Sequence, residues 1–264
     1  VYGALRAAEG ALLVVGASAG AVVGTELAWA QLRAANTPTL VVVNKMDKEN
    51  ADYWKAVDSM REFSPRPVAI QAPIGEEAAF KGVIDLVARK AYGFDAQGRA
   101  SEMPIPAELA ADVEGRRSPL VEAAAETDDA LLEKYLETGE LSDAEVTGAL
   151  AKGVAAGTLV PVLCAASARS IGVGTLLDAI VALLPSPINA DASGPAAALV
   201  FKTTADPFVG RISYVKVISG VLNATNHALT NTSKNQPERV GALGFPKGQT
   251  LEPATEVVAG DIAG

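Results

Sequence analysis

The sequence has one cysteine, one histidine and only 5% aromatic residues among its 264 positions. Cys164 cannot form an intramolecular disulfide, and its place in an apolar run favours a buried, unreactive thiol in a reducing compartment. His227 is the other candidate ligand. One cysteine and one histidine are too few for a structural zinc site, and they do not form a Cys–His nucleophile pair close together in the sequence. The scarcity of aromatics means that the core is built from Ala, Val, Leu and Ile, which suits buried parallel strands.

Long apolar runs and an excess of positive charge are also missing. No stretch approaches the roughly 20 apolar residues needed to cross a bilayer, so no membrane segment is predicted. A net charge of −9 argues against a partner held mainly by phosphate neutralisation, DNA included. The chain opens within a helical pattern, has no signal sequence and ends on Ala-Gly-Asp-Ile-Ala-Gly, so we expect an internal fragment of a larger cytoplasmic protein.

The pattern of apolar residues predicts two domains. Residues 11–15 and 39–43 form apolar runs typical of strands buried on both faces, and a helix over 25–35, with Thr25 as N-cap, joins them. This succession indicates a right-handed parallel crossover. The parallel pattern resumes near residue 160 with a strand over 160–165 and a helix over 173–184.

The segment of about 66–157 has a different character and is predicted to be an inserted α+β subdomain. Its expected elements are strands over 68–72 and 83–87, a turn over 95–98, and helices over 118–136 and 142–157. Residues 187–196 are rich in Pro, Ser and Gly and form the best linker. The β-prone segments beyond it predict a small antiparallel β-barrel over 197–264, truncated at its C-terminal end.

The strongest motif is Asn44-Lys45-Met46-Asp47, which directly follows an apolar strand. One carboxylate can accept both donors of a guanine edge, N1–H and the amine, whereas adenine would leave it unpaired, so Asp47 is the expected guanine reader. Asn44 can tie the loop to its neighbours, and Lys45 can lay its methylene stem across the base. The alternative is an ordinary polar turn, but the pattern arises by chance with a probability of only about 3% in a chain of this length.

Several further motifs accompany this one in order along the chain. They are Ala72-Pro-Ile-Gly-Glu76, Phe80-Lys-Gly-Val-Ile-Asp85, Leu183-Leu-Pro-Ser-Pro187, Phe201-Lys202, Ala205-Asp-Pro-Phe-Val-Gly-Arg211 and Ala259-Gly-Asp-Ile262. Together they resemble the elongation factor G family of translational GTPases over essentially the whole chain. Residues 11–18, 22–26 and 245–250 resemble the elongation factor G-like paralogues more than the main factor.

The resemblance implies a partial GTPase domain of the P-loop type over residues 1–186, with an incomplete, mostly parallel sheet. It also implies a second guanine-contacting loop, which reads Ser-Ala-Leu in the family. Aligning by Gly172 puts Ala166 where the family has Ser, whereas a shift of one residue matches Ser167-Ala168. We assign the contact to Ser167 and Ala168, because a backbone N–H can meet guanine O6 whatever the side chain.

Two motifs of the family are missing from these 264 residues. They are the glycine-rich loop ending in Gly-Lys-Ser/Thr, which holds phosphates and magnesium, and Asp-Thr-Pro-Gly followed by the catalytic His. No catalytic or metal-binding residue is therefore nominated. GTP or GDP is the implied ligand, Mg²⁺ is expected in the intact parent protein only, and this fragment alone is predicted to be inactive. His227, Arg211, Glu76 and Glu77 are interpreted as structural or solvated residues.

The parent protein is expected to be a ribosome-dependent GTPase that promotes tRNA–mRNA translocation, monomeric, with rRNA and ribosomal proteins as its partners. One alternative is a ribosome-protection type of translational GTPase. Another is a non-catalytic guanine-binding or scaffold module that has lost its phosphate site.

Overall fold

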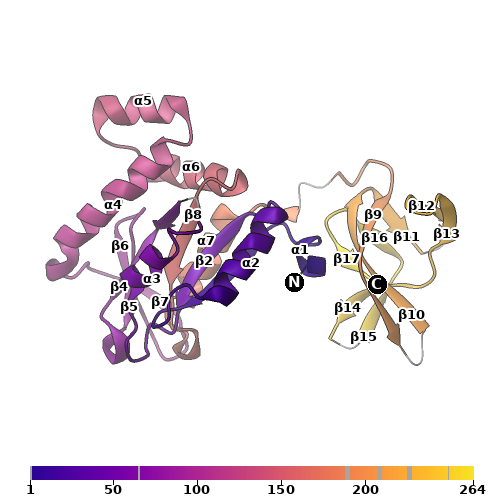
Figure 1. Ribbon diagram of the computed structural model, residues 1–264, viewed down its shortest axis with the longest axis horizontal. Helices are drawn as coiled ribbons and strands as arrows, with labels where there is room; N and C mark the ends of the chain where they lie inside the picture. Colours follow the sequence, from indigo (N-terminus) through magenta and orange to yellow (C-terminus); the bar gives the residue numbers. More distant parts are fainter. Residues whose placement is uncertain (1, 65, 188–190, 207–209, 225–227, 249) are drawn as a thin grey trace. The chain divides into compact units, whose positions relative to one another are not determined.

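The computed structural model of the chain describes residues 2–64, 66–187, 191–206, 210–224, 228–248 and 250–264 (Figure 1). Contacts divide the chain into two compact units. One comprises Gly10–Pro185, and the other comprises the residues up to Glu9 together with Ser186–Gly264. By its contacts, the start of the chain thus belongs with the second unit.

A four-stranded parallel sheet forms the centre of the larger unit, with the strand order β1-β2-β8-β3. Its strands are β1 (Ala11–Gly16), β2 (Thr39–Asn44), β8 (Val160–Cys164) and β3 (Pro67–Ala69). The helices α2 (Val23–Ala34), α3 (Tyr53–Ser59) and α7 (Val173–Leu183) accompany the sheet. The predicted α/β class with parallel pairing is therefore confirmed. The sheet also takes in β3, which lies within the segment assigned to the inserted subdomain.

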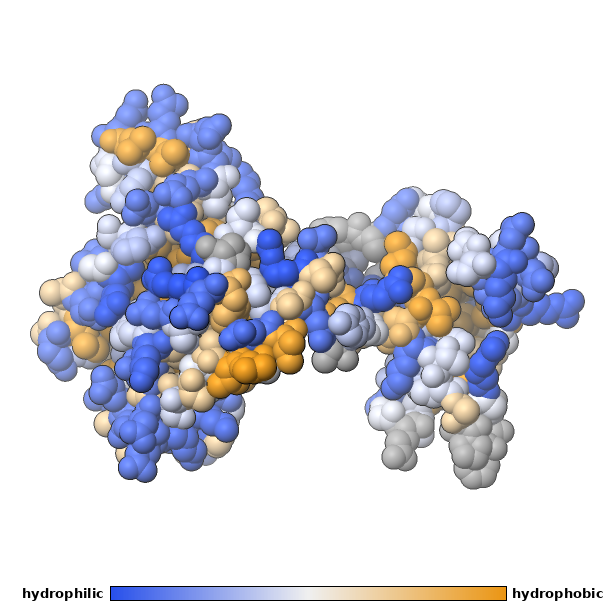
Figure 2. All heavy atoms as spheres, viewed as in Figure 1, coloured by the Kyte–Doolittle hydropathy of each residue, from blue (hydrophilic) through white to orange (hydrophobic). Residues whose placement is uncertain are grey.

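Burial differs between the strands that were expected to be covered on both faces. All five residues of β8 and the first five of β2 are buried, as continuous apolar runs require. The strand predicted over 11–15 is present, but its expected burial on both faces was wrong, because β1 is an edge strand and alternates between buried Leu13 and Val15 and exposed Leu12 and Val14. Figure 2 shows a further apolar patch over the start of α2, where Val22, Val23 and Leu27 are exposed.

The beginning of α2 also differs from the sequence prediction. The helix starts at Val23 with Val22 as its N-cap, so Thr25 is not the N-cap but the third helical residue. From there the Thr25 hydroxyl accepts a hydrogen bond from the Val22 N–H, at 3.2 Å. A hydroxyl at this position satisfies one of the free donors that precede a helix, which is why the threonine still marks its start.

The inserted part contains a four-stranded antiparallel sheet in the order β4-β5-β6-β7 and three helices. Its elements are β4 (Gln71–Ile74), β5 (Gly82–Asp85), β6 (Lys90–Phe94), β7 (Ala100–Met103), α4 (Ala110–Ala125), α5 (Asp129–Thr138) and α6 (Asp143–Ala155), with short 3₁₀ turns η1 (Glu77–Ala79) and η2 (Ala107–Leu109). The single helix predicted over 118–136 is wrong. The chain breaks after α4, where the Thr127 hydroxyl donates to the Ala124 carbonyl and Asp128 accepts from the Ala130 N–H to begin α5.

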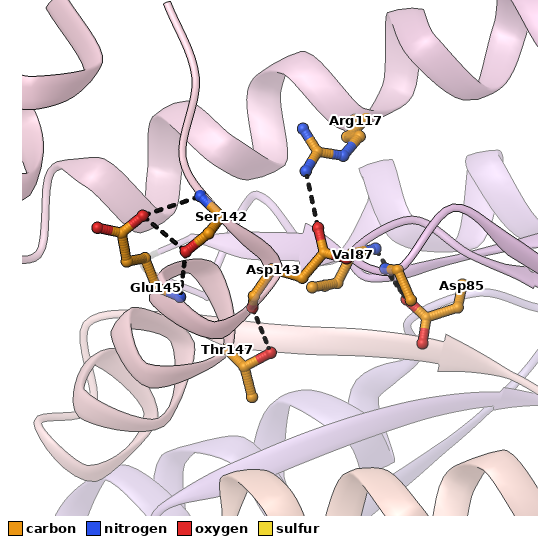
Figure 3. A network of polar contacts seen from close by, with 8 residues as sticks. Asp85, Val87, Arg117, Ser142, Asp143, Glu145 and Thr147 are labelled. Carbon is orange, nitrogen blue, oxygen red and sulfur yellow. Dashed lines mark hydrogen bonds and ion pairs between the residues drawn. The ribbon is translucent and has the colours of Figure 1, made fainter. Parts of the chain in front are cut away.

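A polar network holds the start of α6 to its neighbours (Figure 3). Ser142 and Glu145 form the predicted capping box: the Glu145 N–H donates to the serine hydroxyl at 3.3 Å, and the Ser142 N–H donates to the glutamate carboxylate at 2.9 Å. Hydrogen bonds from Lys134 and from Ser142 hold the pKa of Glu145 at about 2. Arg117 of α4 contacts Asp143 at 3.4 Å, so the helices are joined by charged groups as well as by their apolar faces.

The second unit is an antiparallel β domain, as predicted. Its strands are β9 (Ala197–Asp206), β10 (Gly210–Ser219), β11 (Val221–Asn223), β12 (Ala228–Asn231), β13 (Gln236–Arg239), β14 (Leu243–Lys247), β15 (Thr250–Ala254), β16 (Glu256–Val258) and β17 (Ile262–Ala263). They pair as β17-β10-β9, β11-β16, β12-β13 and β14-β15 around a small apolar core. The short helix α1 (Tyr2–Leu5) belongs to this unit, where Glu9 pairs with the buried ammonium of Lys216 at 2.6 Å.

Three sequence features fall on residues that the structure does not describe in full. His227, residues 207–209 of the motif ending at Arg211, and residues 188–190 of the linker lie outside the described residues. Among the described residues, none of the helices combines the length and the apolar character needed to cross a membrane.

Candidate functional site

Three loops meet at the carboxyl edge of the parallel sheet, one after each of β1, β2 and β8. The Ala17 N–H donates to the Asn44 carbonyl at 2.9 Å, which joins the first loop to the second. The Met46 N–H donates to the Ala165 carbonyl at 3.2 Å, which joins the second loop to the third. Because open α/β sheets bind ligands outside the carboxyl ends of their strands, this edge is the expected place for a site.

The structure brings together two of the predicted site residues that lie 123 positions apart in the chain. The Asn44 amide donates to the Ser167 hydroxyl at 2.9 Å, and the Ser167 N–H donates back to the Asn44 side-chain oxygen at 3.0 Å. A reciprocal pair of this kind fixes both the rotamer of the asparagine and the position of the backbone at Ser167. The loop after β2 and the loop after β8 are therefore held as one structure.

The loop after β2 turns two consecutive side chains, those of Met46 and Asp47, inward between two exposed lysines. Lys45 adopts a left-handed backbone conformation, with φ at 64°, and is exposed, whereas Met46 is 1% exposed and anchors the loop. Asp47 follows, and the exposed fraction of its side chain is 7%. Its carboxylate lies 3.4 Å from the ammonium of Lys48, whose side chain is 60% exposed.

The surroundings of Asp47 decide whether its carboxylate can meet a ligand. Because Lys48 is exposed, solvent partly screens this ion pair, and the lysine can swing into water when a ligand binds. A base that pairs with both carboxylate oxygens would share Oδ2 with Lys48 or displace the lysine from it. The carboxylate is thus largely covered by protein, and its ionic partner is weakly held.

The loop after β8 is a tight turn closed on itself. The Ala166 N–H donates to the Ile171 carbonyl at 2.9 Å, and the Ile171 N–H donates to the Ala166 carbonyl at 3.2 Å. Gly172 has φ at 79°, and a Cβ added there would lie 2.5 Å from the Cys164 carbonyl oxygen, so only glycine fits. This turn places the short 3₁₀ segment η3 (Ser167–Arg169) at the sheet edge.

Ser167 and Ala168, which are assigned to the second guanine contact, differ in whether their hydrogen-bond donors are already paired. The N–H and the hydroxyl of Ser167 are both engaged by Asn44. Ala168 is exposed, and among the hydrogen bonds of the described residues its N–H has no partner. Within this loop, the Ala168 N–H is therefore the backbone donor available to a ligand oxygen.

The residues behind the site are structural. Cys164 is buried at the end of β8, and burial raises the pKa of its thiol, which agrees with the prediction of an unreactive cysteine. In the described part of the chain, no group of three or more His, Cys, Asp or Glu residues is placed to hold a metal ion. Cavities of about 190 and 500 Å³ lie elsewhere, the first beside α3, β3 and α4 and the second beside α1 in the β domain.

A segment that carries no motif for nucleotide binding also reaches the site. Glu77 was interpreted as a solvated residue, but its carboxylate accepts a hydrogen bond from the Asn50 N–H at 2.6 Å. The Phe80 carbonyl accepts one from the Arg169 guanidinium at 3.3 Å. No pattern in the sequence signals these contacts, because each joins loops that are far apart along the chain.

Comparisons with known proteins agree with this fold. Residues 1–186 match the family described as elongation factor Tu GTP binding domain, and residues 195–264 match the family described as elongation factor G domain 2. A crystal structure of a protein from Thermus thermophilus is 36% identical over 99% of this chain, with a TM-score of 0.85. The match covers 39% of that protein, so the chain spans about two fifths of its length.

The fold and these matches define an α/β domain of the GTPase type followed by a β domain, which is the arrangement of a translational GTPase. The chain belongs to the elongation factor G family.

Proposed function

We propose that this chain is the guanine-recognising part of a ribosome-dependent GTPase, together with the β domain that follows it. The observation that carries the proposal is the reciprocal hydrogen bonding of Asn44 and Ser167, which locks two loops side by side at the carboxyl edge of the sheet. Asp47 lies in one of these loops and the free N–H of Ala168 in the other. A purine between them would meet an anionic acceptor on one side and a neutral donor on the other.

The donor and acceptor pattern of this pair is complementary to guanine. The Asp47 carboxylate accepts from N1–H and the amine, and the Ala168 N–H donates to O6. Adenine presents a donor where O6 stands and no donor at N1, so it would leave both protein groups unpaired. The exposed Lys45 stem supplies an apolar cover for the base.

The phosphates of GTP find no comparable partners in these residues. The loop after β1, residues 16–20, contains no lysine, and the sequence holds no Gly-Lys-Ser/Thr motif. The donor set at the sheet edge also does not fit Mg²⁺, which prefers carboxylate, hydroxyl and phosphate oxygens grouped around it, a grouping that the described residues lack. We infer that phosphate and magnesium binding, and hence GTP hydrolysis, require the longer protein, and that this chain alone holds the base weakly.

In the longer protein the proposed activity is GTP hydrolysis on the ribosome coupled to tRNA–mRNA translocation, in the cytoplasm. A single-round translocation assay, with the mRNA position read by primer extension, tests this role. Advance of the mRNA by one codon supports translocation. Release of a ribosome-bound antibiotic without that advance would instead support a protection factor. A longer protein that neither hydrolyses GTP nor advances the mRNA would favour a non-catalytic guanine-binding module.

The base-recognition part is tested on the chain itself by an amide chemical-shift titration with GMP and AMP. GMP is expected to shift the amides of residues 44–51 and 165–171, and AMP is expected to leave them in place. Equal shifts with both nucleotides would refute the assignment of guanine.

A further inference from the structure

The segment from Gly75 to Phe80 contacts both loops of the guanine site. On one side, Glu77 accepts from the Asn50 N–H at 2.6 Å, three residues after Asp47. On the other side, the Phe80 carbonyl accepts from Arg169, which directly follows Ala168, at 3.3 Å. The Phe80 side chain is fully buried and fixes the segment to the core.

The backbone around the Glu77 contact is held in unfavourable conformations. Asn50 and Glu77 both have positive φ, at 59° and 48°; asparagine tolerates this region, whereas glutamate adopts it at a cost that neighbouring contacts must offset. Gly75 has φ at 81°, and a Cβ there would lie 2.2 Å from the Ala79 carbonyl oxygen. The short hydrogen bond between the carboxylate and the Asn50 amide is a charge-assisted contact that stabilises such a backbone.

The loop after β2 is tied to other elements near its two ends, and its middle has fewer ties. Its internal hydrogen bonds run from the Lys48 N–H to the Lys45 carbonyl and from the Ala51 N–H to the Lys48 carbonyl. They curl the loop but do not hold Asn50 against another element; the next backbone tie on that side runs from the Asp52 N–H to the Ala17 carbonyl, at 3.2 Å. Glu77 supplies that support, whereas the neighbouring Glu76 makes no side-chain hydrogen bond among the described residues.

We infer that Glu77 is a positioning residue for guanine recognition, which keeps the Asp47 loop in the shape that the base requires. The inference rests on the proposed function, since it assigns a role in the same site. Glu77 touches no ligand in this arrangement. It acts through the backbone N–H of Asn50. The Phe80 carbonyl of the same segment braces the second loop by accepting a hydrogen bond from Arg169.

The test compares four variants of the chain by amide hydrogen exchange and by chemical-shift titration with GMP and AMP. Glu77→Ala removes the acceptor, and Glu77→Asp keeps the charge but shortens the side chain by one methylene. Both are expected to speed exchange of the Asn50 amide roughly tenfold and to weaken GMP binding roughly threefold to tenfold. Glu77→Gln keeps an acceptor oxygen at the same reach without the charge, so it is expected to bind GMP more tightly than Glu77→Ala and Glu77→Asp do, within about threefold of the wild type.

Glu76→Ala is the matched control, because it removes a neighbouring carboxylate that makes no such contact; its exchange and GMP binding are expected to equal the wild type. Faster Asn50 exchange with unchanged GMP affinity in both Glu77→Ala and Glu77→Asp would overturn the inference. If Glu77→Ala fails to fold, Glu77→Asp against Glu77→Gln decides the question. A wild-type chain that does not distinguish GMP from AMP would instead refute the proposed function, and the exchange of Asn50 would still report whether Glu77 holds the loop.

Discussion

Replacement of Asp47 by asparagine tests whether this side chain recognises guanine. It should change which nucleotide the chain prefers rather than only weaken binding. Asparagine offers one acceptor and one donor where aspartate offers two acceptors. Guanine then keeps its bond from N1–H but brings its amine against the asparagine N–H. Xanthine, which carries a carbonyl oxygen in place of that amine, presents a donor and an acceptor that match the amide.

The magnitude of the change follows from the surroundings of the carboxylate. Its side chain is 7% exposed, so a mismatched donor there is largely cut off from water. A lost hydrogen bond to a charged group costs about 1.5–3 kcal/mol, so GMP binding is expected to weaken by roughly 10-fold to 150-fold. Lys48 is 60% exposed, so solvent partly screens its ion pair with Asp47 and the lysine can move aside into water.

The assay is competitive saturation-transfer NMR with GMP and xanthosine monophosphate on the wild type, Asp47→Asn and Lys48→Met. The wild type is expected to prefer GMP and Asp47→Asn to prefer xanthosine monophosphate. Lys48→Met removes the ionic partner but keeps a side chain of similar length, and should retain the preference for GMP. An Asp47→Asn variant that binds both nucleotides as the wild type does would refute the reasoning, since the carboxylate would then not face the base.

Three other predictions concern stability. The pKa of Glu145 is held at about 2, below its ordinary value of 4.5. Its contribution to folding stability is therefore complete above pH 4.5 and is lost as the pH falls towards 2. The difference in melting temperature between the wild type and Glu145→Gln should shrink over that range. Gly172→Ala should destabilise the larger unit by more than about 2 kcal/mol in urea unfolding, because its Cβ would lie 2.5 Å from a backbone carbonyl oxygen. The matched Gly139→Ala, with φ at 74° and open space around it, should cost only about 1 kcal/mol, and equal losses would show that the close approach does not matter. Lys216→Ala should destabilise the β domain by about 2 kcal/mol, since its side chain is 7% exposed and Glu9 loses its partner; an unchanged unfolding midpoint would contradict this role.

The elements that were predicted correctly from the sequence are those with strong local patterns. The apolar runs of β2 and β8 and the capping box at Ser142 were predicted correctly, because burial on two faces and helix capping leave marks within a few residues. The helix break at Asp128 was missed although its N-cap signal is present. Apolar residues on both sides of the break continue the helical period and hid it.

Long-range features could not be predicted in the same way. The exposed face of β1 depends on its place at the sheet edge, which the apolar run does not reveal. The motif at Asn44 was identified from the sequence, but its bonding to Ser167 depends on how two loops 123 residues apart meet in space. Glu77 was dismissed for the same reason. Its partner, the Asn50 amide, is a backbone group that carries no sequence signature.

The most direct test of guanine recognition without phosphate binding is a titration of the 264-residue chain with GMP, GDP and ADP, followed by amide chemical shifts. We predict weak binding of GMP and GDP with similar affinities, because the second phosphate meets no partner, and no response to ADP. Tight GDP binding that GMP does not match would show that the chain holds the phosphates after all, and an equal response to ADP would show that Asp47 does not read guanine.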